Sequence, residues 1–230
     1  MNSKGAPSNH PRQLDQIQGT EFDLNRMIKE GEHQKQDFKF RIDSSQKIAK
    51  TLCAFANTDG GKLLIGVKDN GRLAGIDPEE EFYMIDGAAN IYCKPAIEFY
   101  STVYSAEDKL ILEIEVPPSI NRPHFAKTED QKWIAYVRQN DENFMANGVL
   151  LSYLRDKTPK SERKNLIAYG DHERMLFDYL SENEEISLSK FSKIAKIPIR
   201  KAEKTLALFI KWEIINWKAT EAGIRFSLVG

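Results

Sequence analysis

The sequence has few cysteines and no long apolar run, and each shortage excludes a class of protein. Cys53 and Cys93 are the only cysteines among 230 residues, and both lie in apolar stretches. Two such thiols provide neither a disulfide framework nor a zinc-ligand pattern, so we expect a reducing, cytoplasmic location. No run of about 18 apolar residues occurs, which excludes a membrane-spanning helix. The polar segment 1–18 lacks the apolar stretch of a secretory signal.

A surplus of basic charge is also missing. The chain has 33 Lys and Arg against 34 Asp and Glu, a formal net charge of -1, whereas nucleic-acid-binding proteins are usually basic. The total conceals an uneven distribution. Residues 155–230 hold 15 Lys and Arg against 11 Asp and Glu, a net charge of +4, which leaves -5 for residues 1–154. This asymmetry predicts two modules and makes the second one the better candidate for contact with phosphates.

Local composition divides the chain into four segments. Residues 1–23 are rich in Ser, Asn, Gln, Pro and Gly, and we expect a disordered leader there. The run 19–22 resembles translated cloning sites, so the leader is either native or vector-derived. Residues 24–155 are predicted to form the first domain, 156–170 a charged linker, and 171–230 a second domain.

Strand and helix patterns are mixed in the first domain. Strands are predicted at 36–40, 62–67, 97–104, 109–116 and 132–138. Helices are predicted at 24–31, 44–56, 78–92 and 141–154. Paired glycines, Gly60 and Gly61, supply the positive φ that a tight turn after a helix needs. These patterns predict an α+β fold with a mixed or antiparallel sheet covered by helices on one side.

The second domain has three amphipathic segments followed by two strand patterns. The amphipathic segments span 171–181, 187–194 and 198–212, and the strands span 214–219 and 224–229. Three short helices followed by a hairpin predict a small winged helix-turn-helix.

Basic residues concentrate on the last two of these helices. Seven basic residues and one acidic residue, Glu203, lie between Ser187 and Lys211. The candidate nucleic-acid-binding residues are Lys190, Lys193, Lys196, Arg200, Lys201 and Lys204. Cations on a recognition helix replace counterions at phosphates, and Arg200 suits bidentate base readout, so we predict duplex DNA binding. A solvated lysine face on a protein-interaction module is the alternative.

The first domain offers two further candidate sites. Glu32, Asp37 and Asp69 could meet at one rim of the sheet and hold Mg²⁺ or Mn²⁺ for phosphodiester cleavage. The alternative is a set of local roles, with Asp69 as a hairpin-turn residue and Asp37 paired with Lys39. Arg138 shares a strand face on which single-stranded nucleic acid could stack, although ordinary sheet packing is the other explanation.

Several motifs resemble the Schlafen-type AlbA-like DNA-binding domain. They are AFANTDGG at 54–61, LLIGVKDNG at 63–71, RPHFAK at 122–127 and AYVR at 135–138. The resemblance covers about residues 24–154 and implies an α+β fold, nucleic-acid binding and transcriptional regulation. Bacterial members of this family often carry a C-terminal winged helix, in agreement with the pattern of 171–230.

The resemblance also implies an alternative activity. Schlafen-core proteins cut structured RNA with a carboxylate triad and a divalent metal, and Glu32, Asp37 and Asp69 match the triad by position. Asp37 stands where the family usually has Glu, and a shorter side chain reaches less far. Schlafen cores hold two copies of this domain, so a comparable groove would need a homodimer of this chain. The cysteines of the family's zinc site are absent.

We therefore expect a bacterial DNA-binding regulator that needs no cofactor to bind DNA and dimerises, and the sequence leaves open whether it is also an enzyme. The alternative is an endoribonuclease that uses Mg²⁺ or Mn²⁺ on structured RNA, and a third hypothesis is a protein-interaction adaptor.

Overall fold

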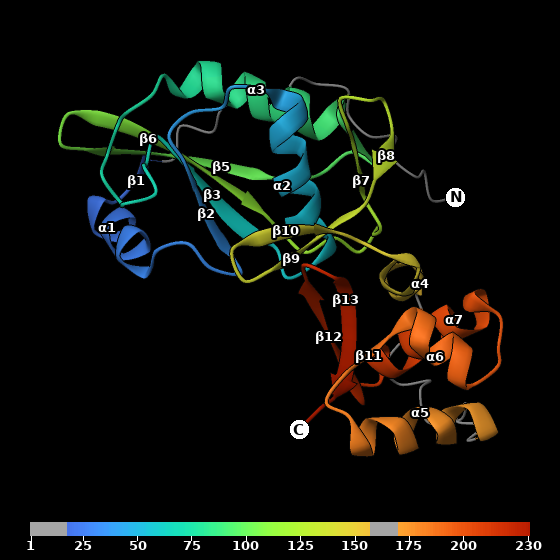
Figure 1. Ribbon diagram of the computed structural model, residues 1–230. Helices are drawn as coiled ribbons and strands as arrows, with labels where there is room; N and C mark the ends of the chain where they lie inside the picture. The colour runs from blue at the N-terminus through green and yellow to red at the C-terminus, as the bar shows by residue number, and fades with distance from the viewer. Residues whose placement is uncertain (1–17, 157–169) are drawn as a thin grey trace, which may run out of the picture.

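A computed structural model describes residues 18–156 and 170–230 (Figure 1). The first module is built around a five-stranded sheet with helices, and the second is a smaller unit of helices and a short sheet. The predicted α+β class is therefore confirmed. Within the described residues, no helix is both long and apolar enough to cross a membrane.

The central sheet is mixed, which is one of the two sheet types that the sequence patterns predict. Its strands follow the order β1 (Gln18–Gly19), β5 (Tyr100–Ala106), β6 (Lys109–Val116), β3 (Gly61–Ile65) and β2 (Gln36–Lys39). The three middle strands pair antiparallel, whereas β1 pairs parallel with β5 and β2 pairs parallel with β3. Because successive side chains point to opposite faces, both faces of the sheet need a cover.

Two helices cover one face, and a third covers the other. α2 (Ser45–Asn57) and α3 (Pro78–Asn90) bury Leu63 and Ile65 of the sheet in one core. α1 (Glu21–Glu30) packs on the opposite face, where Leu64 lies in a separate core with Leu24. The expectation that helices cover only one side is therefore wrong, because both faces of β3 are apolar and buried.

The folded domain begins earlier than the predicted leader allows. Residues 18–23, which we assigned to a disordered leader, form β1 and the first turn of α1. Thr20 caps α1 by accepting a hydrogen bond from the Asp23 N–H, and Leu24 is fully buried. Residues 1–17, the rest of the leader, lie outside the described residues.

Short strands and a helix complete the first module. The strands are β4 (Cys93–Lys94), β7 (Phe125–Lys127), β8 (Trp133–Ile134), β9 (Tyr136–Gln139) and β10 (Glu142–Met145), and the helix is α4 (Gly148–Arg155). The predicted strand 132–138 is thus divided between two small sheets. The predicted helix 141–154 begins only at Gly148, because Asn140 turns the chain with a φ of 57° and β10 pairs with β9.

The second module has the predicted order of elements. It consists of α5 (Asp171–Glu182), β11 (Ile186–Ser187), α6 (Leu188–Ile194), α7 (Ile199–Lys211), β12 (Ile215–Thr220) and β13 (Gly223–Leu228). Its strands form an antiparallel sheet in the order β11, β13, β12. α4 contributes Val149, Leu150 and Leu154 to this module's core. The last helix of the first module therefore packs against the second module. Residues 157–169, most of the predicted linker, lie outside the described residues.

Candidate functional site

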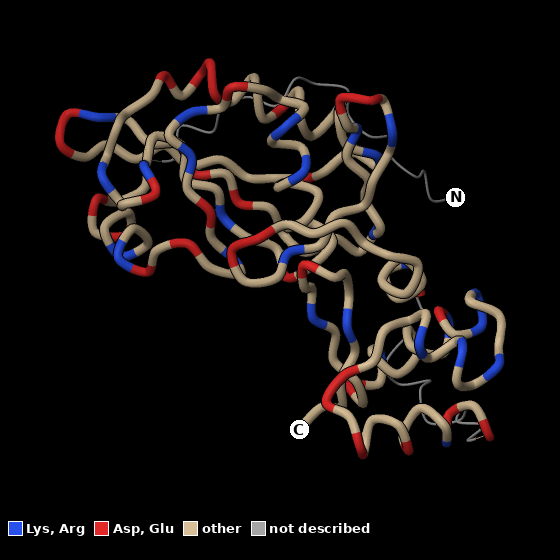
Figure 2. Tube along the Cα trace, viewed as in Figure 1, with Lys and Arg blue, Asp and Glu red and all other residues tan. Residues whose placement is uncertain are grey.

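The second module carries an exposed basic face on α6, the following turn and the first half of α7. We call it the α6–α7 face, and its residues are Lys190, Lys193, Lys196, Arg200, Lys201 and Lys204, all of them exposed. Figure 2 shows these cations at the end of the molecule away from the central sheet. Within the described parts of the chain, none of the six forms an ion pair with Asp or Glu. Their charges are therefore available to an anionic partner.

The amphipathic pattern of α7 creates this face. Ala202, Leu206, Phe209 and Ile210 are buried along one side of the helix. Arg200, Lys201 and Lys204 project on the other side, because residues three or four apart share a helix surface. The seventh cation of the region, Lys211, is only 7% exposed, and its Nζ lies 2.7 Å from Asp156 Oδ1. Lys211 therefore anchors the end of α7 and does not belong to the face.

Glu203, the single acidic residue of α7, is turned away from the cations. Its carboxylate contacts Gly148 in the first turn of α4 and fills the space that a methyl group at Gly148 would need. The N-terminal end of a helix carries partial positive charge and favours a carboxylate. This contact leaves the α6–α7 face without negative charge. Nothing in the local sequence of α7 indicates the contact between Glu203 and Gly148.

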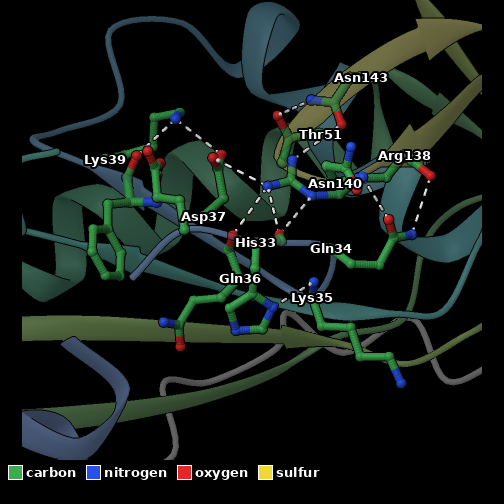
Figure 3. Close-up of polar contacts among 12 residues, drawn as sticks. His33, Gln34, Lys35, Gln36, Asp37, Lys39, Thr51, Arg138, Asn140 and Asn143 are labelled. Carbon is green, nitrogen blue, oxygen red and sulfur yellow. Dashed lines mark hydrogen bonds and ion pairs between the residues drawn. The ribbon is translucent and has the colours of Figure 1, made fainter. Parts of the chain in front are cut away.

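Arg138 is a structural residue, and the prediction that it binds nucleic acid is wrong. Its guanidinium is fully buried and donates to the carbonyl oxygens of His33 and Gln36 at 3.0–3.3 Å (Figure 3). It also donates to Asn143 Oδ1 at 3.3 Å and stacks 4.8 Å from the centre of the Phe55 ring. All of these partners belong to this chain, so no face of the guanidinium is open to a phosphate or a base.

Asp37 belongs to the same cluster. Its Oδ2 lies 2.9 Å from Lys39 Nζ and its Oδ1 lies 3.5 Å from Arg138 Nη2, and the residue is 6% exposed. Figure 3 shows the carboxylate between these two cations. An ion pair that far from solvent holds its partners firmly, because removing either one leaves an uncompensated buried charge. The carboxylate of Asp37 is therefore engaged within the protein.

Glu32 lies beside Asp37 but makes different contacts. Its Oε1 accepts a hydrogen bond of 2.9 Å from the Phe38 N–H. Burial raises the pKa of Glu32 above its ordinary value, and the neighbouring carboxyl of Asp37 raises the pKa further through a hydrogen bond and charge repulsion. The Phe38 N–H and Lys39 act in the opposite direction. The two carboxyl groups therefore adjoin, and this environment raises the pKa of Glu32 above its ordinary value.

Asp69 is not brought together with the other two carboxylates. It is exposed in the turn between β3 and α3, where the Gly71 N–H donates to the Lys68 carbonyl oxygen at 2.7 Å. Across the described ranges, no group of three or more His, Cys, Asp or Glu side chains is placed to hold a metal ion. The residues present do not fit the Mg²⁺ or Mn²⁺ site that the family resemblance implies, and the ribonuclease hypothesis gains no support from them.

Comparison with known proteins places the first module in a family. Residues 32–147, half of the chain, match the family model described as Schlafen, AlbA_2.

Two solved structures are similar to parts of the chain. The DIP2311 protein from Corynebacterium diphtheriae is 18% identical with a TM-score of 0.40, and the similarity covers 55% of this chain and 24% of that one. The N-terminal domain of a RecG-related protein from Nitrosomonas europaea is 23% identical with a TM-score of 0.39, covering 46% of this chain and 81% of that one. The chain thus spans about a quarter of the Corynebacterium protein. The family match carries the assignment: this chain belongs to the Schlafen AlbA_2 family.

Proposed function

We propose that this protein is a DNA-binding transcriptional regulator whose second module, a winged helix-turn-helix, contacts duplex DNA through the α6–α7 face. Membership of the Schlafen AlbA_2 family supports a nucleic-acid partner. The observation that carries the proposal is the set of six exposed cations on α6, α7 and the turn between them, from which Glu203 is turned away. None of the six is paired with an acidic side chain among the described residues. Release of counterions from DNA by such cations supplies essentially all of non-specific binding and a large share of specific binding.

The position of the cations within α7 supports contact with the major groove. Arg200 and Lys201 lie in the first turn of α7, and the N-terminal residues of a recognition helix are those that reach base edges. The planar guanidinium of Arg200 matches the two acceptors of guanine, whereas the lysines act as point charges at phosphates. We therefore assign base readout to Arg200 and backbone contact to the lysines.

Binding to mixed-sequence duplex DNA, measured by fluorescence anisotropy at several salt concentrations, tests the proposal. If the five lysines neutralise phosphates, the slope of log K against log salt is about -4.5, and affinity falls about 500-fold between 50 and 200 mM salt. The variant Lys201→Glu with Lys204→Glu should abolish most of the binding, because it reverses two charges on the α6–α7 face.

The matched control is Lys29→Glu with Lys94→Glu. It changes the net charge by the same amount on exposed residues of the first module, so it should leave most of the affinity intact. Equal losses in the two double variants would show a non-specific charge effect and contradict the proposal. Absent or salt-insensitive binding of the natural sequence would also overturn it, and structured RNA in the same assay tests RNA as the partner.

We further propose that the DNA-bound species is a homodimer. Two-fold dimers place two recognition helices in successive major grooves, one helical turn apart. Sedimentation of the complex with a palindromic duplex should give two protomers per duplex, and a single protomer would contradict this part of the proposal.

A further inference from the structure

The β12–β13 hairpin, the wing of the proposed winged helix, contacts the first module. β12 lies at the edge of its sheet, so its outward amides have no strand partner. The Ala219 N–H donates to Gln139 Oε1 at 2.7 Å, and Gln139 is the last residue of β9. Figure 1 shows the hairpin extending from the core of the second module to the end of β9. An edge amide of the wing is thus satisfied by a side chain of the other module.

Trp217 extends this contact. It lies two residues before Ala219, so the two side chains share a face of the strand. Trp217, Gln139, Leu150 and Tyr153 line a cavity of about 250 Å³ between the hairpin, β9 and α4. The hairpin is therefore held to the first module by the Ala219–Gln139 hydrogen bond, and Trp217 lines the cavity beside it.

The hairpin also offers little positive charge to DNA. The Arg225 Nε lies 3.3 Å from Glu185 Oε1, so this cation is already paired. The turn at the end of the hairpin carries an exposed Glu221. Lys218 is the remaining cation of the two strands, in contrast to six on the α6–α7 face. Release of counterions from phosphates needs available cations, and the hairpin has one.

We propose that the β12–β13 hairpin is a brace between the two modules and that the α6–α7 face holds the duplex without it. The inference rests on the proposed function, since it concerns how the same surface engages DNA. Gln139 and Trp217 are then positioning residues that fix the direction of α7 relative to the central sheet. The hairpin takes no part in the contact with DNA.

A matched pair of neutralising variants tests the assignment of contacts. Lys201→Gln should reduce the slope of log K against log salt by about 0.9, the contribution of one phosphate contact. Lys218→Gln removes the same charge from the hairpin and should leave the slope unchanged. Equal reductions in the two variants would overturn the brace while supporting DNA binding. If neither variant changes the slope, the proposed α6–α7 contact itself fails.

The variant Gln139→Ala tests the brace directly. Hydrogen exchange at the Ala219 amide should become faster, because its acceptor is lost, while the slope of log K against log salt stays the same. Unchanged exchange at Ala219 would contradict the brace. A rise in DNA affinity would also overturn it, because it would show that release from Gln139 lets the hairpin bind DNA.

Discussion

Replacing Arg138 by Leu tests the conclusion that this residue supports the fold. The substitution removes the donors to the carbonyl oxygens of His33 and Gln36 and leaves Asp37 with Lys39 as its nearest cation. Breaking one side of a buried ion pair costs about 3–5 kcal/mol. Here the two carbonyl acceptors stay buried without their donors, and Asp37 keeps Lys39 as a partner but loses its buried cation. At about 2–4 °C per kcal/mol for a chain of this size, the melting temperature should fall by about 6–20 °C.

Urea denaturation followed by circular dichroism measures the change in the free energy of unfolding. Arg138→Lys should also destabilise the protein, since an ammonium keeps the charge but does not reproduce the fork of donors. Combining Arg138→Leu with Asp37→Asn should recover about 0.5–3 kcal/mol, the coupling expected for residues in contact. A loss below about 1 kcal/mol in Arg138→Leu, together with weaker nucleic-acid binding, would refute this reasoning and restore Arg138 as a binding residue.

Two further predictions concern the glycine turn and Glu32. Gly60 has a φ of 72°, and a methyl group there would lie 2.7 Å from the Val116 carbonyl oxygen, so Gly60→Ala should cost about 2 kcal/mol or more. Gly31 has a similar φ of 73°, but nothing lies within 4 Å of an added methyl group, so Gly31→Ala should lower the free energy of unfolding by less. Urea denaturation measures both variants, and equal losses of unfolding free energy would contradict the steric argument. The raised pKa of Glu32 means that its contribution to stability is present below its ordinary value of 4.5 and is lost as the pH rises through the folded-state pKa. Glu32→Gln, which resembles the protonated form, should therefore gain stability relative to the natural protein as the pH rises above 4.5. Urea denaturation at a series of pH values measures this gain, and a difference in unfolding free energy that does not change with pH would argue against the raised pKa.

Local patterns predicted much of the fold because they record which side of each element is buried. The order of elements in the second module follows from amphipathic spacing, and the Gly60 turn follows from the positive φ that glycine permits. The family resemblance, based on contiguous motifs, is confirmed by the match over 32–147. The exposed positions of Arg200 and Lys201 likewise follow from the helical period of α7.

Tertiary structure decided the features that depend on distant partners. Arg138 looked like a surface cation, but its acceptors His33 and Gln36 lie more than 100 residues earlier in the chain. Glu203 looked like part of a charged helix surface until α4 supplied Gly148 as its neighbour. A local pattern records the period of a helix or strand, whereas the burial of a charge depends on which other segment folds against it. The sequence alone thus determined the elements and their family, and the packing between segments decided which charges remain available to a partner.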